Sequence, residues 1–259
     1  TLNAADSIYI NSSITAEDDN GKLALHYGQG AAAASNDANY FINAPINLKA
    51  GDNFFTKLGN DGTETTWTVI TELGSAGSTT GTDLQGINGN LSGNYVLGTN
   101  INASATSTWN GDKGFDPIGY YNINTNTSFA FTGTFDGLGH TIDGLYIKRS
   151  DEDDIGLFGY TDGASISNVG LTNVDITGDD YVGGLVGANY RSDITNSYVT
   201  GDVTGNYYVG GLVGENNAKS TIKDSYTTVD VAGDGNVGGL VGDDYRSKIT
   251  NSYALGEVN

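Results

Sequence analysis

Cysteine and methionine are absent from this chain of 259 residues, proline occurs only twice, and basic residues are scarce. Without cysteine there can be neither a disulfide framework nor a thiolate metal site. The 11 Lys and Arg stand against 31 Asp and Glu, which gives a formal net charge of −20. Nucleic acid and anionic membrane surfaces would repel such a chain, so we expect it to bind neither. No apolar run approaches the roughly 20 residues that span a bilayer, so we expect no membrane insertion.

Glycine, tyrosine and β-branched residues are abundant instead, with 39 Gly and 16 Tyr. This composition is typical of short strands joined by turns rather than of helices. The chain begins "TLNAADS", without methionine and without a recognisable signal peptide. We therefore expect a piece of a larger, processed protein.

Internal repeats dominate the second half of the sequence. "GGLVG" starts at Gly183, Gly210 and Gly238, at intervals of 27 and 28 residues, and a weaker copy, "GLFG", precedes them. A row of isoleucines keeps the same period: Ile166, Ile194, Ile222 and Ile249. Because two separate features hold one period, the sequence predicts a structural unit of about 28 residues.

A repeat of this length without a helical segment suits one coil of a β-solenoid. Its strands would pair with the same strands of neighbouring coils, about 4.8 Å away, and the isoleucines would stack inside. A polar ladder is expected from the residues that follow the isoleucines: Asn196, Asp224 and Asn251. The repeat varies by one residue between Gly214 and Ile222 and between Ile166 and Gly178. These two points of variation predict loops, which tolerate insertions better than strands do.

The first half carries weaker repeats of the same kind. "YINSSIT" from Tyr9 matches "FINAPIN" from Phe41 with a shift of 32 residues, and "LNAADSIYI" from Leu2 matches "LKAGDNFFT" from Leu48 with a shift of 46. "GSAGSTTGTD", from Gly74 to Asp83, indicates a seam or a long loop.

Several of these segments resemble known families. "GGLVG" and "GLFG" are similar to the GLUG motif of bacterial surface proteins, including IgA-peptidase-type proteins, and "FTGTFDGLGHTIDGLYI" is similar to stretches that lead into such repeats. The "L-x-A-x-D" pattern near the N-terminus resembles filamentous-haemagglutinin-like exoproteins of two-partner secretion systems. The resemblance implies a right-handed parallel β-helix, all-β, which at 20 to 30 residues a coil makes roughly nine to twelve coils with essentially no α-helix. It also implies export through an outer-membrane secretion partner that would act on regions outside this chain.

The resemblance and the repeats together divide the chain into three segments. We expect haemagglutinin-like β-helix coils over residues 1–80 and transitional coils over 81–148, with a projecting loop near 120–128. GLUG-repeat coils of about 28 residues would follow over 149–259. The last repeat stops at "GEVN", where another "GGLVG" is due, so we expect further coils beyond Asn259.

Parallel β-helices also carry polysaccharide lyases and hydrolases, so an enzyme is the alternative interpretation. Its best candidate is "FDGLGHTIDG", where Asp136, His140 and Asp143 could perform acid–base chemistry. The glycines of this stretch mark turns and its isoleucine and leucine suit a core, which favours a structural role.

Two acidic stretches raise the question of a metal ion. "AEDDNG", from Ala16, and "SDEDDIG", from Ser150, are turn-like and rich in the oxygen ligands that calcium prefers. Neither has EF-hand spacing, and rows of carboxylates usually form solvated loops. We therefore expect no cofactor, with calcium as the alternative.

Aromatic residues recur at fixed positions of the coil and carry the candidate binding sites. Tyrosines recur after the polar ladder: Tyr198, Tyr226 and Tyr253. They form either a structural ladder or a platform for sugars. The turn after "GGLVG" carries a second set, Tyr190 with Arg191 and Tyr245 with Arg246. Counting back from the isoleucines aligns both tyrosines with Ala218 of the middle repeat. A flat ring beside a guanidinium suits a glycan, whereas an exposed Arg–Asp pair is the structural alternative.

The sequence thus favours a non-catalytic adhesive or structural segment of a large secreted bacterial adhesin. We expect exposure at the bacterial outer-membrane surface, polysaccharide or host and matrix glycans as partners, and a part in attachment or biofilm. The repetition and the scarcity of His and basic residues favour this function over an enzyme.

Overall fold

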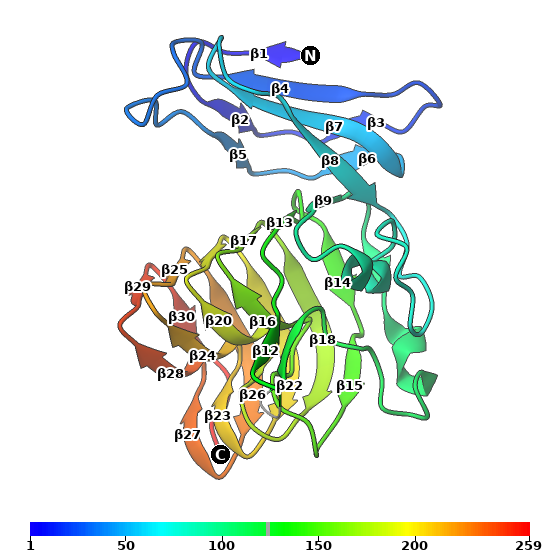
Figure 1. Cartoon of the computed structure of the whole chain (residues 1–259), viewed down its shortest axis with the longest axis vertical. Coiled ribbons are helices and arrows are strands. Elements are labelled where there is room, and N and C mark those ends of the chain that lie inside the picture. Colours follow the sequence, from blue (N-terminus) through cyan, green and yellow to red (C-terminus); the bar gives the residue numbers. More distant parts are fainter. Residues whose placement is uncertain (123–124) are drawn as a thin grey trace.

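The computed structural model describes residues 1–122 and 125–259, which form a parallel β-solenoid of about nine turns (Figure 1). One sheet extends from the first strand to the last repeat and is termed the long sheet. Its strands, in spatial order, are β1 (Leu2–Asn3), β4 (Leu23–Tyr27), β7 (Gly51–Leu58), β8 (Thr65–Ile70), β9 (Asn94–Leu97), β13 (Thr134–Asp136), β17 (Ser165–Ser167), β21 (Asp193–Thr195), β25 (Thr221–Lys223) and β29 (Lys248–Thr250). The expected all-β solenoid is confirmed, with a coil number at the lower end of the expected range.

Three further sheets complete the coils of the second half. The second sheet contains β10 (Ile101–Asn102), β14 (Thr141–Asp143), β18 (Gly170–Thr177), β22 (Tyr198–Thr204), β26 (Tyr226–Ala232) and β30 (Tyr253–Ala254), with β15 (Tyr146–Lys148) also paired to β18. The third sheet contains β16 (Phe158–Asp162), β20 (Val186–Tyr190), β24 (Val213–Asn217) and β28 (Val241–Tyr245). The fourth sheet contains β19 (Val182–Gly183), β23 (Tyr207–Gly210) and β27 (Gly235–Gly238).

Helical structure is confined to two short 3₁₀ helices, η1 (Gln85–Gly89) and η2 (Ser104–Thr108), within the described part of the chain. Neither approaches the length and hydropathy that a membrane-crossing helix needs. The expected near-absence of α-helix is confirmed for residues 1–122 and 125–259.

The isoleucine row lies inside the solenoid, as the sequence predicts. Ile166 pairs with Ile194, Ile194 with Ile222, and Ile222 with Ile249 along the long sheet. The first three are buried, whereas Ile249 is 36% exposed because no later strand packs on it. Each coil therefore buries its apolar residues only with the help of its neighbours, which is the defining property of a solenoid.

The "GGLVG" motif forms the corner between the fourth and third sheets. A Cβ on its first glycine would lie 2.1 Å from a carbonyl oxygen at Gly183 and 2.0 Å at Gly210 and Gly238. No larger residue fits there, so glycine recurs in every repeat. The valines that follow the corner, Val186 and Val213, pair across coils and are buried.

A second corner is held by hydrogen bonds between serines of successive coils. The backbone N–H of Ser197 donates to Ser225 Oγ (3.2 Å), and that of Ser225 donates to Ser252 Oγ (3.1 Å). Because Ser197 and Ser225 are buried, these hydroxyls replace water as partners for N–H groups that the turn leaves unpaired.

The predicted polar ladder lies just before these serines. Asn196, Asp224 and Asn251 all have φ near +50° (49°, 51° and 51°), a backbone conformation that Asn and Asp tolerate well. Asn251 Nδ2 donates to Asp224 Oδ1 at 3.0 Å, and Asn196 Nδ2 donates to Asn168 Oδ1 at 2.8 Å. The predicted ladder is thus confirmed for Asp224 and Asn251, whereas Asn196 bonds to Asn168 of the preceding coil.

The two points of variation have different structures. At the first, Ala218 and Lys219 form a turn with φ of 57° and 74°, so the predicted loop is confirmed. At the second, the extra residue is a β-bulge inside β18, where the register shifts between Leu171 and Val174. The prediction of a loop there was wrong, because a bulge can hold one extra residue without ending the strand.

Strands β1 to β8, residues 1–70, form an N-terminal layer above the repeat coils in Figure 1. It also contains β2 (Ile8–Ile10) paired with β5 (Tyr40–Ile42) and β3 (Ile14–Ala16) paired with β6 (Ile46–Leu48). These pairs confirm the predicted shift of 32 residues. The predicted shift of 46 was wrong, since Leu2 pairs with Leu25 and not with Leu48.

One pair of strands within the layer is antiparallel, unlike the parallel pairs of the solenoid. β7 and β8 are antiparallel, with a bulge between Asp52 and Phe54, so the expected parallel helix is interrupted here. The layer has a core of its own, whose largest members are Phe54 and Trp67, and Leu138 of the solenoid packs into it. The remaining solenoid shares a second core from Ile70 to Val231.

The connecting region contains both predicted irregular segments. Residues 74–83 form no strand, as expected for a seam or long loop. The segment predicted as a projecting loop near 120–128 contains an antiparallel hairpin, β11 (Tyr120–Asn122) with β12 (Thr127–Phe129). Its tip, residues 123–124, lies outside the described residues. On the hairpin, the rings of Tyr120 and Phe129 stack at 4.8 Å.

Candidate functional site

The predicted Tyr–Arg sites lie at the ends of the third-sheet strands. Tyr190 ends β20 and Tyr245 ends β28, and both pair with Asn217 of the coil between them. The prediction that Ala218 aligns with these tyrosines was wrong. The extra residue of the middle repeat lies after the end of strand β24, so Asn217, and not Ala218, occupies the position of the tyrosines. The two tyrosines therefore do share one coil position, two coils apart.

The two arginines differ in their contacts. The Arg191 guanidinium forms a bidentate ion pair with Asp162 of the preceding coil, with 2.7 Å from Nε to Oδ1. The Arg246 guanidinium lies over the ring of its neighbour Tyr245, 4.9 Å from the ring centroid. Tyr190 stacks on Tyr160, whereas Tyr245 is 51% exposed. The Arg–Asp pair that we considered as the structural alternative thus exists at Arg191.

A second aromatic row follows the second sheet. Tyr198 stacks on Tyr226 at 5.0 Å, and Tyr226 on Tyr253 at 5.3 Å, with nearly parallel rings. A cavity of about 210 Å³ lies between this row and the polar ladder. Its lining includes Tyr198 and Tyr226 of the row, together with His140, Asn168 and Asn196. The rings thus stack face to face along the row, and the amide groups of the polar ladder lie beside them.

The candidate acid–base residues each have a structural partner. Asp136 is buried and accepts hydrogen bonds from Tyr40 Oη (2.7 Å), Asn168 Nδ2 (2.9 Å) and the Leu138 N–H (2.8 Å). Burial raises the pKa of Asp136. These contacts fix the junction with the N-terminal layer and leave no carboxylate oxygen open for catalysis.

His140 and Asp143 are engaged separately from Asp136. His140 is buried, with Nε2 2.9 Å from the Ile46 carbonyl oxygen and Nδ1 3.1 Å from Asn100 Oδ1, and burial lowers its pKa. Hydrogen bonds from Thr172 and Asn173 lower the pKa of Asp143. The fold thus does not bring the three candidate catalytic residues together at one open site.

The acidic stretch from Ser150 contributes to a cavity under the β11–β12 hairpin. The cavity has a volume of about 400 Å³ and is lined by Asp116, Tyr120, Tyr121 and residues 152–155, among others. Glu152 is paired with Lys113 and the buried Arg149, each at 2.7 Å. Asp154 is buried and accepts a hydrogen bond from the Tyr121 N–H (3.0 Å), and burial raises its pKa to about 7.

Neither acidic stretch assembles a cation site among the described residues, where no group of three or more His, Cys, Asp or Glu converges. In the first stretch, Asp19 pairs with Lys49. The cavity under the hairpin is not predictable from the sequence, because its lining residues come from segments more than 25 positions apart.

These features define a class of molecule: a repetitive β-solenoid with stacked aromatic residues on its surface. The sequence matches the family described as "The GLUG motif" over residues 178–204 and 205–232. The first match covers the coil from Gly178 and the second the coil from Gly205, so the family motif and the structural repeat coincide.

Two proteins are similar to larger parts of the chain. Halomucin from Haloquadratum walsbyi is 39% identical over 178 residues, which are 64% of this chain and 2% of halomucin. A crystal structure from Bacteroides ovatus, described as a candidate immunoglobulin A1 protease, has a TM-score of 0.54 over 75% of this chain and 67% of that one, with 19% identity. The second likeness concerns the fold alone. The first, with the GLUG repeats, indicates a cell-surface or secreted protein. Neither tests the likeness to filamentous-haemagglutinin-like exoproteins, which stays a prediction.

Proposed function

We propose that this chain is a non-catalytic adhesive segment of a large secreted or cell-surface protein, and that it attaches to polysaccharide or to matrix glycans. The observation that carries the proposal is the repetition of outward aromatic residues at fixed coil positions, in the stack of Tyr198, Tyr226 and Tyr253 and in the Tyr–Arg turns. A repeated platform binds a repetitive polymer at several points, so that weak single contacts add up.

The separate engagement of Asp136, His140 and Asp143 supports attachment over catalysis. Each residue of the candidate constellation is held by structural partners, and the constellation is not assembled. Of the Tyr–Arg turns, the one at Tyr245 is the better binding position, because Arg246 lies over an exposed ring and Arg191 is occupied by Asp162. Tyr245 would stack on a sugar while Arg246 donates to its oxygens.

The place of the protein in the cell is part of the proposal. The full-length protein would be exported through a two-partner route, as the resemblance of the N-terminal coils implies, and would act at the outer-membrane surface in attachment or biofilm formation. Absence of cysteine suits passage through a secretion pore, since a disulfide formed earlier would hinder an unfolded chain.

The test is retention of the purified chain on surfaces coated with bacterial exopolysaccharide or with matrix glycans. We expect wild type to be retained, and the variant Tyr190→Ala with Tyr245→Ala to be retained less while it still melts well above the assay temperature. Tyr207→Ala is the matched control, because Tyr207 is 48% exposed but belongs to the fourth sheet. Failure of wild type to bind any coated surface would refute the adhesive function.

A further inference from the structure

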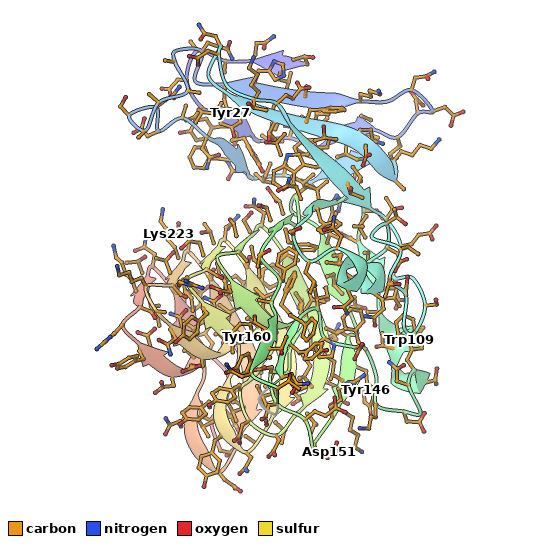
Figure 2. All side chains as sticks on the ribbon, in the orientation of Figure 1. Tyr27, Trp109, Tyr146, Asp151, Tyr160 and Lys223 are labelled. Atoms are coloured by element: carbon orange, nitrogen blue, oxygen red, sulfur yellow. The ribbon has the colours of Figure 1, made fainter. Side chains whose placement is uncertain are left out.

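A groove lies along the outer face of the long sheet, between the repeat strands of that sheet and the part of the N-terminal layer that contains Tyr27 and residues 39–43. Its volume is about 670 Å³, and its floor is formed by the neighbouring strands β13, β17, β21 and β25. Figure 2 labels one residue on each side, Tyr27 in the N-terminal layer and Lys223 on the repeat coils. The layer is held in place by the bond from Tyr40 to Asp136 and by the contact between His140 and the Ile46 carbonyl. The groove is thus a fixed feature between two packed bodies.

The floor of the groove consists of small polar side chains in register. Thr134 lies next to Ser165, while Ser167 lies next to Thr195 and Thr195 next to Lys223. From β13 to β25 there are three strand spacings, so the floor is about 14 Å long. It offers a row of hydroxyl groups, with the amides of the polar ladder beside it, along the solenoid axis.

The side of the groove formed by the N-terminal layer combines aromatic rings with polar groups. Tyr27, Tyr40, Phe41 and the buried Trp67 line it, together with the amides of Asn39 and Asn43. Phe41 is 42% exposed, and the rings of Tyr27 and Tyr40 are 5.8 Å apart. A ligand in the groove would therefore meet hydroxyls and amides on one side and, on the other, apolar ring surfaces beside further amides. Sugars have this same division between polar edges and apolar faces.

The charge of the groove differs from that of the whole protein. Although the chain has a formal net charge of −20, only three lining residues carry charge. Lys223 and Asp224 form an ion pair of 3.4 Å, and Asp136 is buried under its three hydrogen-bond donors. The groove therefore suits an uncharged ligand, since it offers no open cluster of charges to neutralise one.

A peptide fits the groove less well than a sugar. An extended peptide binds by adding to a free strand edge, and an amphipathic helix needs an apolar trough. The floor strands are already paired on both sides, and most of their outward side chains carry hydroxyls. We propose that this groove binds a linear, neutral oligosaccharide along the solenoid axis, between the polar floor and the aromatic rings of the N-terminal layer. The proposal extends the glycan-binding function proposed above and adds a site separate from the Tyr–Arg turns.

Calorimetric titration of the whole chain with cellohexaose, maltohexaose, mannohexaose and hexagalacturonate tests the proposal. We expect binding of at least one neutral hexasaccharide. The variant Ser167→Leu with Thr195→Leu should weaken that binding by about tenfold or more, because it removes two hydroxyl partners and narrows the floor. The matched control is Thr221→Leu with Thr250→Leu, on the same sheet face but outside the groove, and it should bind like wild type.

The outcomes separate the groove from the adhesive function. Unchanged hexasaccharide binding in the groove variant, equal loss in the control, binding of hexagalacturonate alone, or no hexasaccharide binding would each overturn the groove proposal. Binding of gelatin peptides in place of every sugar would also overturn it and would assign the groove to a protein partner. The adhesive function stands or falls separately, by retention on coated surfaces and its dependence on Tyr190 and Tyr245.

Discussion

In the repeat coils, residues 155–259, neighbouring coils meet mostly through like residues, whereas in the N-terminal layer like pairs are confined to strands β1 to β6 and the contacts around Phe54 join unlike residues. Isoleucine lies on isoleucine, serine on serine and tyrosine on tyrosine in the repeats. In the layer, Leu23 pairs with Phe54, and Phe54 packs between the rings of Tyr40 and Trp67. A repeat can therefore be stacked on any copy of itself, while the layer depends on one particular set of shapes.

The largest expected effect is in the layer. Phe54→Ala removes a fully buried ring and should cost about 3–5 kcal/mol. Because the layer and the repeats have separate cores, hydrogen exchange should show loss of protection in residues 1–70 with protection kept in 155–259. Loss of protection across the whole chain would mean that both regions unfold as one unit.

The matching change in the repeats is Ile222→Ala, in the middle of the isoleucine row. We expect a loss of about 2–5 kcal/mol in unfolding free energy, because Ile222 is fully buried between two coils. Ile249→Ala is the control: the same residue type at the same coil position, but 36% exposed, so its cost should be clearly smaller. Equal losses from urea denaturation would contradict a stability that comes from neighbouring coils.

Asp154, between the hairpin and the first repeat, gives a pH-dependent effect. Burial raises its pKa to about 7 in the folded chain from an ordinary value of 3.8, so the folded state binds the proton more tightly. The stabilisation by this proton is complete below pH 4 and is lost as the pH rises through 7. Asp154→Asn keeps an acceptor for the Tyr121 N–H and should stabilise the chain at pH 8 by about 2–4 kcal/mol.

Melting curves of wild type and Asp154→Asn at pH 4 and pH 8 measure this effect. The gain should be small at pH 4, where the carboxyl group is neutral in the folded chain and, at its ordinary pKa of 3.8, still partly protonated in the unfolded chain. A gain of equal size at both pH values would show that the variant acts through packing and not through titration.

The smallest expected effect comes from a single rung of the serine ladder. Ser225→Ala leaves the buried N–H of Ser197 without its acceptor and should cost about 1–3 kcal/mol. Thr228→Ala, an exposed position of the same coil, serves as the control and should change stability by less than about 0.5 kcal/mol. If Ser225→Ala lowered the unfolding free energy no more than Thr228→Ala does, the serine hydrogen bonds would not contribute to holding the coils together.

The structure of the repeat coils could be predicted from the sequence because identical residue types stack on one another in successive coils. The isoleucine row and the tyrosine stack follow from one period with the predicted residues, and the polar ladder does so for Asp224 and Asn251. The alignment of Ala218 with Tyr190 failed because a repeat count does not tell on which side of a strand end an extra residue lies. The bulge in β18 was missed because a repeat count does not tell whether an extra residue lies in a loop or inside a strand.

The layer and the groove were largely beyond sequence reasoning. The pairing of β2 with β5 was predicted because the two segments have similar sequences. The pairing of Leu23 with Phe54 and the antiparallel pairing of β7 with β8 join segments whose sequences are not similar. The groove depends on how the layer is set against the coils, and this rests on contacts such as Tyr40 to Asp136, which are 96 positions apart. The spacing of residues along the chain does not predict a contact between side chains so far apart in sequence.

The serine and isoleucine ladders have a consequence for how such a protein changes in evolution. A coil whose upper and lower faces match can be duplicated or deleted as a block of 27 or 28 residues by unequal recombination, and the two flanking coils will still fit together. Each event would lengthen or shorten the molecule by about 4.8 Å without altering its cross-section. The length of the solenoid thus becomes a quantity set by gene length, adjustable in uniform steps while the cross-section stays the same.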